Sequence, residues 1–390
     1  MATVAFFAPA AAGHVNPTLG LAAELVRRGH RVTYATTKTY AERVAATGAE
    51  VVPVTSTWEG RDVETPQMHG KELARAMNMV LTETKSMLAQ LSDADKPDLV
   101  VHDGTMCWWG RILAVRWQVP AVETWPNFVG NEHWSMAQKY TTFNPLSPRF
   151  LLMAVRISRF LQKEGAGAMD GFMRGDGAAL RLVALPRAFQ YAGDTFTDRY
   201  EFVGPLFADR TDQGDWEPSG DLPVALVSLG TAYNDRPDFY RTVLQSAADR
   251  PWQVVLAIGT VDAGVLGAVP PNVEVHRQVP QLAVLRHAKA FVTHAGMGST
   301  MESLHFGVPM VAVPQMAEQR ANADRIAELG LGTVLAPDRI TADPLWTAVE
   351  RVADDEHVRE RLAWMRGEMT AAGGVPAAAD AVERTLGRPG

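Results

Sequence analysis

Residues 291–302 read Phe-Val-Thr-His-Ala-Gly-Met-Gly-Ser-Thr-Met-Glu, and this stretch decides the fold of the second half of the chain. Aromatic and β-branched residues come first, two glycines interrupt them, and residues suited to a helix follow. The pattern predicts a strand, a tight loop and a helix capped by a serine or threonine. Glycines let backbone amides approach a ligand, and a helix start favours an anion, so we expect a phosphate here. The residues assigned to this loop are Gly296, Met297, Gly298, Ser299 and Thr300.

Polar residues around the loop narrow the choice of phosphate compound. His294 precedes the glycines and can hydrogen-bond an anion, while Glu302 lies one helical turn beyond them, where its carboxylate can accept both hydroxyls of a ribose. Glu318 and Gln319 follow the next apolar run, residues 310–313, so a parallel sheet would bring them to the same edge. Together these residues predict binding of a ribose, a diphosphate and a second polyhydroxy group. The alternative is an ordinary strand-to-helix turn whose glycines serve packing.

Composition limits the classes of protein that the chain can be. With 390 residues, 47% of them hydrophobic, the chain is too long for one core and predicts two α/β domains. The net charge of −7 argues against nonspecific nucleic-acid binding. A single cysteine, Cys107, indicates a reducing compartment, and the N-terminus lacks the pattern of a signal peptide, so we expect a cytoplasmic protein. No apolar run is long enough to form an integral membrane segment.

The first residues of the chain predict a βαβ unit. Residues 4–8 read as a buried strand, residues 17–28 as a helix with Asn16 at its N-cap, and residues 31–36 as a second strand. His14 would then stand at the carboxyl edge of the first strand, where open α/β sheets bind ligands. A helix N-terminus favours the neutral imidazole, which suits a general base. The alternative is a loop histidine that only caps or packs.

The domain boundaries follow from composition. Residues 208–222 are polar and rich in turn formers, which predicts a linker between an N-terminal domain, 1–207, and a C-terminal domain, 223–390. The second domain restarts with a buried strand at 224–229. Gly230 and Thr231 come directly after it and can offer an amide and a hydroxyl to a phosphate.

Large apolar side chains gather just beyond the predicted strand ends of the first domain. Rings and thioethers offer broad, adaptable contact area, so these residues suit an apolar acceptor pocket, although ordinary core packing is the alternative for each of them. The residues assigned to this pocket are Met79, Met106, Trp108, Trp125 and Phe128.

Five pieces of the sequence, in this order, resemble the nucleotide-sugar-dependent glycosyltransferases of the UDP-glycosyltransferase superfamily. The chain is most similar to the bacterial members that glycosylate macrolides and other natural products. The resemblance implies two Rossmann-like, doubly wound α/β domains that face each other across a cleft, the GT-B fold, with a last helix that crosses back to the first domain. The matching pieces are residues 13–17, 97–103, 228–231, 279–281 and 294–319.

The same resemblance assigns roles to single residues. It makes His14 the base and Asp103 the carboxylate that orients it, whereas alone Asp103 would read as a loop residue with local hydrogen bonds. It also assigns binding of the nucleotide base to Gln278, Val279 and Gln281. Many family members carry a tryptophan where this chain has Gln278, so the choice between a UDP-sugar and a dTDP-sugar stays open.

These expectations combine into a reaction. The donor hexose would pass to a hydroxyl of an apolar acceptor such as a macrolide or phenolic compound, with inversion and with no cofactor or metal. Polar groups at Glu318 and Gln319 favour glucose over a deoxysugar. Asp93 and Asp95 have the spacing of a metal pair but precede a surface turn, so no metal site is predicted.

Three other classes of protein share parts of this pattern. A nicotinamide-dependent oxidoreductase is disfavoured because the glycine pattern is incomplete and the second strand lacks a ribose-binding acid. A non-catalytic protein that binds nucleotide sugars and a nucleotide-sugar epimerase remain as alternatives.

Overall fold

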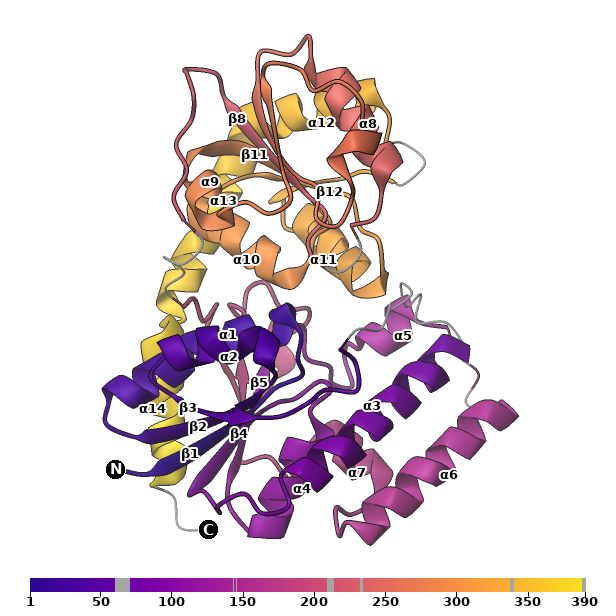
Figure 1. The fold of residues 1–390 in the computed structure, drawn as a ribbon, viewed down its shortest axis with the longest axis vertical. Helices are drawn as coiled ribbons and strands as arrows, with labels where there is room; N and C mark the ends of the chain where they lie inside the picture. The colour runs from indigo at the N-terminus through magenta and orange to yellow at the C-terminus, as the bar shows by residue number, and fades with distance from the viewer. Residues whose placement is uncertain are drawn as a thin grey trace. The chain divides into compact units, whose positions relative to one another are not determined.

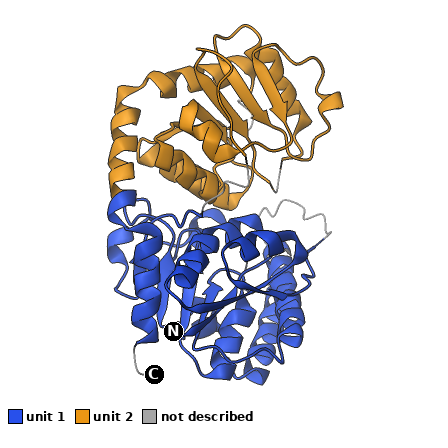
Figure 2. Cartoon of the chain, turned by 60° about the vertical axis from the view of Figure 1, so that its left-hand side comes forward, with its two compact units in different colours: residues 1–209, 369–390 blue, residues 210–368 orange. Residues whose placement is uncertain are grey.

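The structure is a computed structural model of the chain, and it describes residues 1–59, 71–142, 144, 146–208, 214–231, 234–336 and 340–387. The chain divides into two compact units, coloured separately in Figure 2. Unit 1 comprises Met1–Asp209 and Met369–Gly390, and unit 2 comprises Arg210–Glu368. Each unit contains one sheet, and all the strand pairs described are parallel. Two parallel-sheet α/β domains are thereby confirmed.

The sheet of unit 1 has seven strands among the described residues, and its order reverses direction next to the first strand. The strands, in spatial order, are β3 (Glu50–Pro53), β2 (Arg31–Thr36), β1 (Thr3–Phe7), β4 (Leu99–Asp103), β5 (Ala121–Trp125), β6 (Leu180–Val183) and β7 (Tyr200–Phe202). Figure 1 shows helices on both faces of this sheet. They are α1 (Ala12–Arg27), α2 (Lys38–Ala46), α3 (Lys71–Gln90), α4 (Trp108–Trp117), α5 (Met136–Tyr140), α6 (Pro148–Lys163), α7 (Met169–Arg174) and α14 (Gly374–Leu386), with the short turn η1 (Gly193–Thr195).

Alternation along the strands gives each face of the sheet its own core. Val4 and Phe6 of β1 join a cluster with residues of α1 and α14, whereas Ala5 and Phe7 join a cluster with residues of α3, α4 and α6. Successive side chains of a strand point to opposite faces, so a strand covered on both sides is apolar throughout. This explains why the buried strands read as continuous apolar runs in the sequence.

The sheet of unit 2 is built in the same way from six described strands. In spatial order they are β10 (Val273–His276), β9 (Gln253–Ala257), β8 (Val224–Ser228), β11 (Ala288–Thr293), β12 (Met310–Ala312) and β13 (Gly332–Val334). Its helices are α8 (Pro237–Ala247), α9 (Gln281–His287), α10 (Met297–Phe306), α11 (Ala317–Glu328), α12 (Ala342–Asp354) and α13 (Glu356–Ala371), with the turn η3 (Ala263–Val265). Helix α13 begins in unit 2 and ends in unit 1.

The segment predicted as a linker is partly packed on unit 2. Residues 209–213 lie outside the described residues, but the indole Nε1 of Trp216 donates to Glu274 Oε2 at 3.0 Å. The backbone N–H of Ser219 donates to Gln253 Oε1 at 3.1 Å. Although residues 208–222 are polar, the part from residue 214 onward is therefore attached to the sheet of unit 2.

The last helix belongs to unit 1, where it packs against α1. Arg28, at the end of α1, donates from Nη1 to Asp380 Oδ1 and to Glu383 Oε2 of α14, each at 2.6 Å.

None of the described helices is long and apolar enough to cross a membrane.

Candidate active site

The strand order of unit 1 places His14 and Asp103 at one point of the sheet. The order reverses between β1 and β4, and open α/β sheets bind ligands at the carboxyl ends of the strands at such a point. His14 is the third residue of α1, which follows β1, and Asp103 is the last residue of β4. The two side chains meet, with His14 Nδ1 at 2.8 Å from Asp103 Oδ2. The sequence-predicted pair is thus brought together by the structure.

The loop after β4 fixes the orientation of the carboxylate. Asp103 Oδ1 accepts hydrogen bonds from Thr105 N at 3.0 Å, Thr105 Oγ1 at 2.6 Å and Met106 N at 2.9 Å. The other oxygen, Oδ2, faces His14. Because an ionised carboxylate can only accept, the proton of the imidazole is on Nδ1 and its lone pair is on Nε2. Thr105 was missed from the sequence, although an aspartate two residues before a threonine is typical of a turn closed by the aspartate side chain.

Asp103 is only 1% exposed and keeps its charge through these contacts. Burial alone would raise its pKa, but the attraction and hydrogen bond of His14, with the hydrogen bonds from Thr105 and Met106, hold the pKa of Asp103 below its usual value. The carboxylate is therefore ionised at neutral pH and can stabilise a positive charge on His14.

Helix α1 starts earlier than the sequence predicts. Its N-cap is Ala11, so Asn16 does not cap it and Pro17 lies inside the helix. The amides of His14 and Val15 both reach the carbonyl of Ala11, at 3.0 Å each, which begins the helical ladder before the proline. His14 consequently sits in the first turn of the helix and not in a preceding loop.

Unit 2 repeats this geometry around its own point of reversal, between β8 and β11. The loop after β11 leads into α10, whose N-cap is Gly296 with no side-chain cap. The prediction that Ser299 or Thr300 caps the helix is therefore wrong, because the helix begins at Met297. Thr300 N donates to Gly296 O at 2.9 Å, which leaves the amides of residues 297–299 without an intrahelical acceptor, as at any helix start. Three N–H groups at the positive end of α10 can thus bind an anion.

His294 is held between two glycines. A Cβ on Gly296 would lie 2.4 Å from His294 Nε2, and one on Gly230 would lie 2.5 Å from the same ring. Gly230 also has φ of +78°, which disfavours any other residue. Burial lowers the pKa of His294 to about 4, so the ring is neutral at physiological pH and can donate a hydrogen bond without adding charge. The glycine at 296 is explained by this ring, whereas Gly298 has open space around it.

Two of the predicted donor contacts need correction, and a third stays a proposal. The Gly230 amide, predicted to bind a phosphate, instead donates to Ser228 Oγ at 3.2 Å. Thr231 is exposed, and its hydroxyl keeps its predicted role as a proposal. Thr300 is completely buried on the inner face of α10, so it packs within unit 2 and cannot contact a ligand.

Two of the residues predicted to hold the nucleoside, Gln281 and Glu302, are joined by a hydrogen bond between α9 and α10. Gln281 Nε2 donates to Glu302 Oε2 at 2.6 Å and to Ser299 Oγ at 3.1 Å. Gln278 is exposed, and Val279 packs partly against the core of unit 2. Glu302 itself is only 4% exposed, and its predicted contact with the hydroxyls of a ribose stays a proposal.

The pair predicted to bind the sugar divides into two different environments. Glu318 is half-buried in the first turn of α11, and its Oε1 accepts from Asn322 Nδ2 at 3.2 Å. Gln319 is only 5% exposed, and its Oε1 accepts from the backbone of Gln315 at 2.8 Å. The carbonyl of Gln319 therefore supports its own loop, and the predicted contact of its amide Nε2 with the sugar stays a proposal. Asn322 was missed, although it lies one helical turn after Glu318.

The predicted acceptor residues also separate by burial. Trp108 is 3% exposed and meets Phe172 edge-to-face at 6.0 Å, and Phe128 is 5% exposed and stacks on Phe189 at 5.5 Å. These two rings belong to the core, so their assignment to the acceptor pocket is corrected. Trp125 is half-buried and donates from Nε1 to Glu123 Oε2 at 3.2 Å. Met79 and Met106 are half-buried and keep surface available for a ligand.

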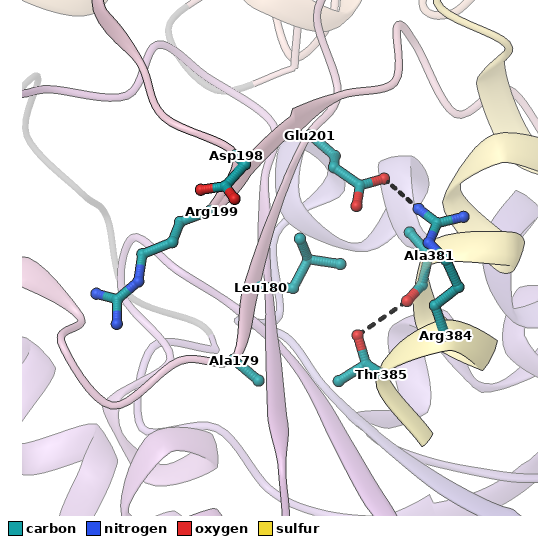
Figure 3. A pocket seen from close by; sticks show the side chains of 8 residues that line it. All are labelled: Ala179, Leu180, Asp198, Arg199, Glu201, Ala381, Arg384 and Thr385. Atoms are coloured by element: carbon teal, nitrogen blue, oxygen red, sulfur yellow. Dashed lines mark hydrogen bonds and ion pairs between the residues drawn. The ribbon is translucent and has the colours of Figure 1, made fainter. Parts of the chain in front are cut away.

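A pocket of about 440 Å³ lies at the opposite edge of the unit 1 sheet, where β6 and β7 begin beside α14 (Figure 3). None of the sequence-predicted residues lines it. An ion pair between Arg384 and Glu201, at 2.7 Å, crosses one side, and the side chain of Arg199 points away from it. Because open α/β sheets bind ligands at the carboxyl ends of their strands, we assign the site to the edge that carries His14.

Comparisons with known proteins agree with this geometry. Residues 241–384 match the model of the erythromycin biosynthesis protein CIII-like C-terminal domain, and residues 12–163 match a glycosyl transferase 4-like domain. The chain is 39% identical to demethyllactenocin mycarosyltransferase of Streptomyces fradiae, covering 99% of this chain and 87% of that protein. It is 41% identical to the oleandomycin glycosyltransferase of Streptomyces antibioticus, covering 99% and 91%.

A solved structure shows the same relationship. The calicheamicin glycosyltransferase CalG4 superposes with a TM-score of 0.87 at 37% identity, over 100% of this chain and 99% of that one. With full-length relatives at this identity, the chain belongs to the family of GT-B glycosyltransferases that contains these natural-product enzymes, and it is a glycosyltransferase that uses a nucleotide sugar.

Proposed function

We propose that the chain moves a hexose, glucose, from a UDP- or dTDP-sugar to a hydroxyl of an apolar natural product such as a macrolide or phenolic compound, with inversion at the anomeric carbon. The observation that carries the proposal is the hydrogen bond of 2.8 Å between His14 Nδ1 and Asp103 Oδ2. It gives the protein an oriented base whose lone pair, on Nε2, can take the proton of an alcohol.

The acceptor half of the reaction uses this pair. His14 Nε2 removes the proton of the acceptor hydroxyl as the oxygen attacks the anomeric carbon, and the bond from that carbon to the diphosphate breaks. One displacement from the face opposite the leaving group inverts the configuration. The imidazolium that forms is stabilised by the ionised Asp103 and then releases its proton to water.

The donor half uses the start of α10. The amides of residues 297–299 and the positive end of the helix stabilise the charge that develops on the departing diphosphate, and neutral His294 adds a hydrogen-bond donor. Glu302, held by Gln281, accepts the hydroxyls of the ribose. The scheme assigns no step to a metal or a cofactor.

The finer identity of the substrates rests on two features. The half-buried carboxylate of Glu318 can accept hydrogen bonds from sugar hydroxyls, and a deoxysugar would lose those bonds, which supports glucose. Half-buried Met79 and Met106 offer adaptable apolar contact, and two of the relatives are named for macrolide antibiotics, which supports an apolar acceptor. The buried free thiol of Cys107 fits our further expectation of a cytoplasmic protein.

The test is the release of nucleoside diphosphate with a panel of donors and a mixed set of macrolide and phenolic acceptors, with products identified by mass spectrometry. His14→Ala should lose transfer while its dissociation constant for the nucleoside diphosphate stays within about twofold, because His14 lies in unit 1. Full turnover by this variant would refute the role of His14 as the base. Product formed from the donor alone would point to an epimerase.

A further inference from the structure

One residue of the donor loop has an unusual backbone. Ala295 lies between His294 and Gly296 with φ of +61°, in the left-handed region, and its side chain is completely buried. A residue with a Cβ pays a conformational cost there, so the surroundings must hold it in place. Its N–H donates to Thr293 Oγ1 at 3.2 Å, which fixes one side of the residue.

The other side of Ala295 is held by Asn322 from the second turn of α11. Asn322 is completely buried, and its Nδ2 donates to the carbonyl of Ala295 at 2.8 Å. The same amide nitrogen donates to Glu318 Oε1 at 3.2 Å. Figure 1 shows α10 and α11 as neighbours in unit 2, so this single side chain joins the second helix to the loop before the first.

We propose that Asn322 is a positioning residue that holds Ala295 in its left-handed conformation and fixes the distance between the Glu318 carboxylate and the amides at the start of α10. Both hydrogens of its amide group are used, one for each partner. The part that concerns Glu318 rests on the proposed function, because it treats this carboxylate as the ligand of the donor sugar.

The conformation of Ala295 decides where the next amides point. Residue 295 is followed directly by Gly296, the N-cap of α10, and then by the amides that can bind an anion. If Ala295 relaxed to negative φ, the peptide that follows would rotate, and the start of the helix would lose its alignment with a diphosphate. The hydrogen bond from Asn322 opposes this relaxation.

Asn272 provides a matched control in the same unit. Its half-buried amide also holds backbone carbonyls, with Nδ2 at 2.9 Å from the oxygens of Ala247 and Trp252, but it precedes β10, at the opposite end of the strands from the donor loop. Replacing either asparagine with alanine removes an amide that ties two segments together. Only one of the two is connected to Ala295.

The experiment measures the dissociation constants of UDP and dTDP by calorimetry, the donor KM and kcat, and the thermal unfolding temperature. Asn322→Ala should raise the dissociation constant for the nucleotide and the donor KM about tenfold. This is the factor expected when Ala295 must adopt the left-handed conformation without the hydrogen bond from residue 322. Asn272→Ala should lower the unfolding temperature but leave both constants within about twofold of the wild type.

A rescue separates positioning from general stability. Glycine adopts positive φ without cost, so Ala295→Gly introduced into Asn322→Ala should recover most of the lost nucleotide affinity without recovering the unfolding temperature. The inference is overturned if Asn322→Ala binds nucleotide as well as Asn272→Ala does, or if the glycine restores nothing. If the wild type binds nucleotide but transfers no sugar, only the proposed function is refuted. If the wild type binds neither UDP nor dTDP, the proposed function and the role of Asn322 are both refuted.

Discussion

Replacement of Asp103 by asparagine tests the base most directly, because it removes a charge while keeping the shape of the side chain. The amide oxygen of an asparagine can take the place of Oδ1 and accept from Thr105 and Met106 as before. Its NH2 group then faces His14 Nδ1 in the position of Oδ2. An NH2 group cannot accept, so Nδ1 must become the acceptor and the proton moves to Nε2. The nitrogen proposed to act as the base would then have no lone pair.

The magnitude follows from the lost tautomer and the lost charge. Two unit charges about 2.8 Å apart attract each other by about 6 kcal/mol at an effective dielectric constant of about 20, which is an upper bound for the stabilisation of the imidazolium. An asparagine recovers part of this through its dipole. We therefore expect kcat to fall by about 10³ to 10⁴-fold, as in other enzymes in which the aspartate behind a histidine base becomes an asparagine.

The assay compares Asp103→Asn with Asp98→Asn in steady-state transfer. Asp98 precedes the same strand at its other end, where its Oδ2 accepts from Thr3 N at 2.7 Å, so it is an exposed carboxylate that also accepts a backbone hydrogen bond. Only Asp103→Asn should lose kcat, while the donor KM of both variants stays near that of the wild type. If Asp103→Asn kept more than a tenth of wild-type kcat, or if combining it with His14→Ala multiplied the two losses, the two residues would not act as one unit.

Three further outcomes follow from the packing. Gly296→Ala should destabilise unit 2 by about 1–3 kcal/mol, because its Cβ would lie 2.4 Å from His294 Nε2. Adding His294→Ala should recover stability in thermal unfolding, and no recovery would contradict the steric reason. Burial lowers the pKa of His294 to about 4, below about 6.5 for an unfolded histidine, so the unfolded chain binds the proton first as pH falls. Between pH 7 and pH 4, the free energy of unfolding of the wild type should therefore fall by about 3 kcal/mol more than that of His294→Asn. Chemical denaturation at several pH values measures both, and an equal fall in the two proteins would refute this. Glu123→Gln should destabilise unit 1 by about 3–5 kcal/mol, because buried Arg111 and Arg181 lose their carboxylate partner. Glu164→Gln removes a more exposed ion pair with Arg116, so it should change the free energy of unfolding by less than about 1 kcal/mol.

Much of the fold could be predicted because buried parallel strands are apolar along their whole length. The first residues of β4 and β8 are apolar on both faces, and helices such as α6 and α8 carry an apolar stripe. Helix starts were less predictable. Gly296 and Ala11 cap α10 and α1 without a side-chain hydrogen bond, so no capping side chain marks these starts and the helices were predicted to start too late.

The candidate site could be predicted where a residue type is unusual for its position, and not where its partner decides its role. A histidine after a buried strand and two glycines before a helix stand out in a sequence. Nothing local in the sequence indicates that the carbonyl of Gln319 accepts a hydrogen bond from Gln315 N. Trp108 and Phe128 looked like pocket residues because the sequence does not show which large rings face each other in the core.

In each unit a second residue fixes the residue that the proposed reaction uses. The two units differ in how this is done. Asp103 accepts three hydrogen bonds from its own loop in addition to the one from His14, so the base in unit 1 is held without unusual backbone. In unit 2 the backbone itself is unusual. Of the non-glycine residues with positive φ in the described part of the chain, Ala295 alone stands beside a predicted ligand-binding residue, since Gln118 and Ala192 flank α4 and η1. A cost stored at Ala295 and opposed by Asn322 is what a loop requires if its amides must be aligned before the diphosphate arrives.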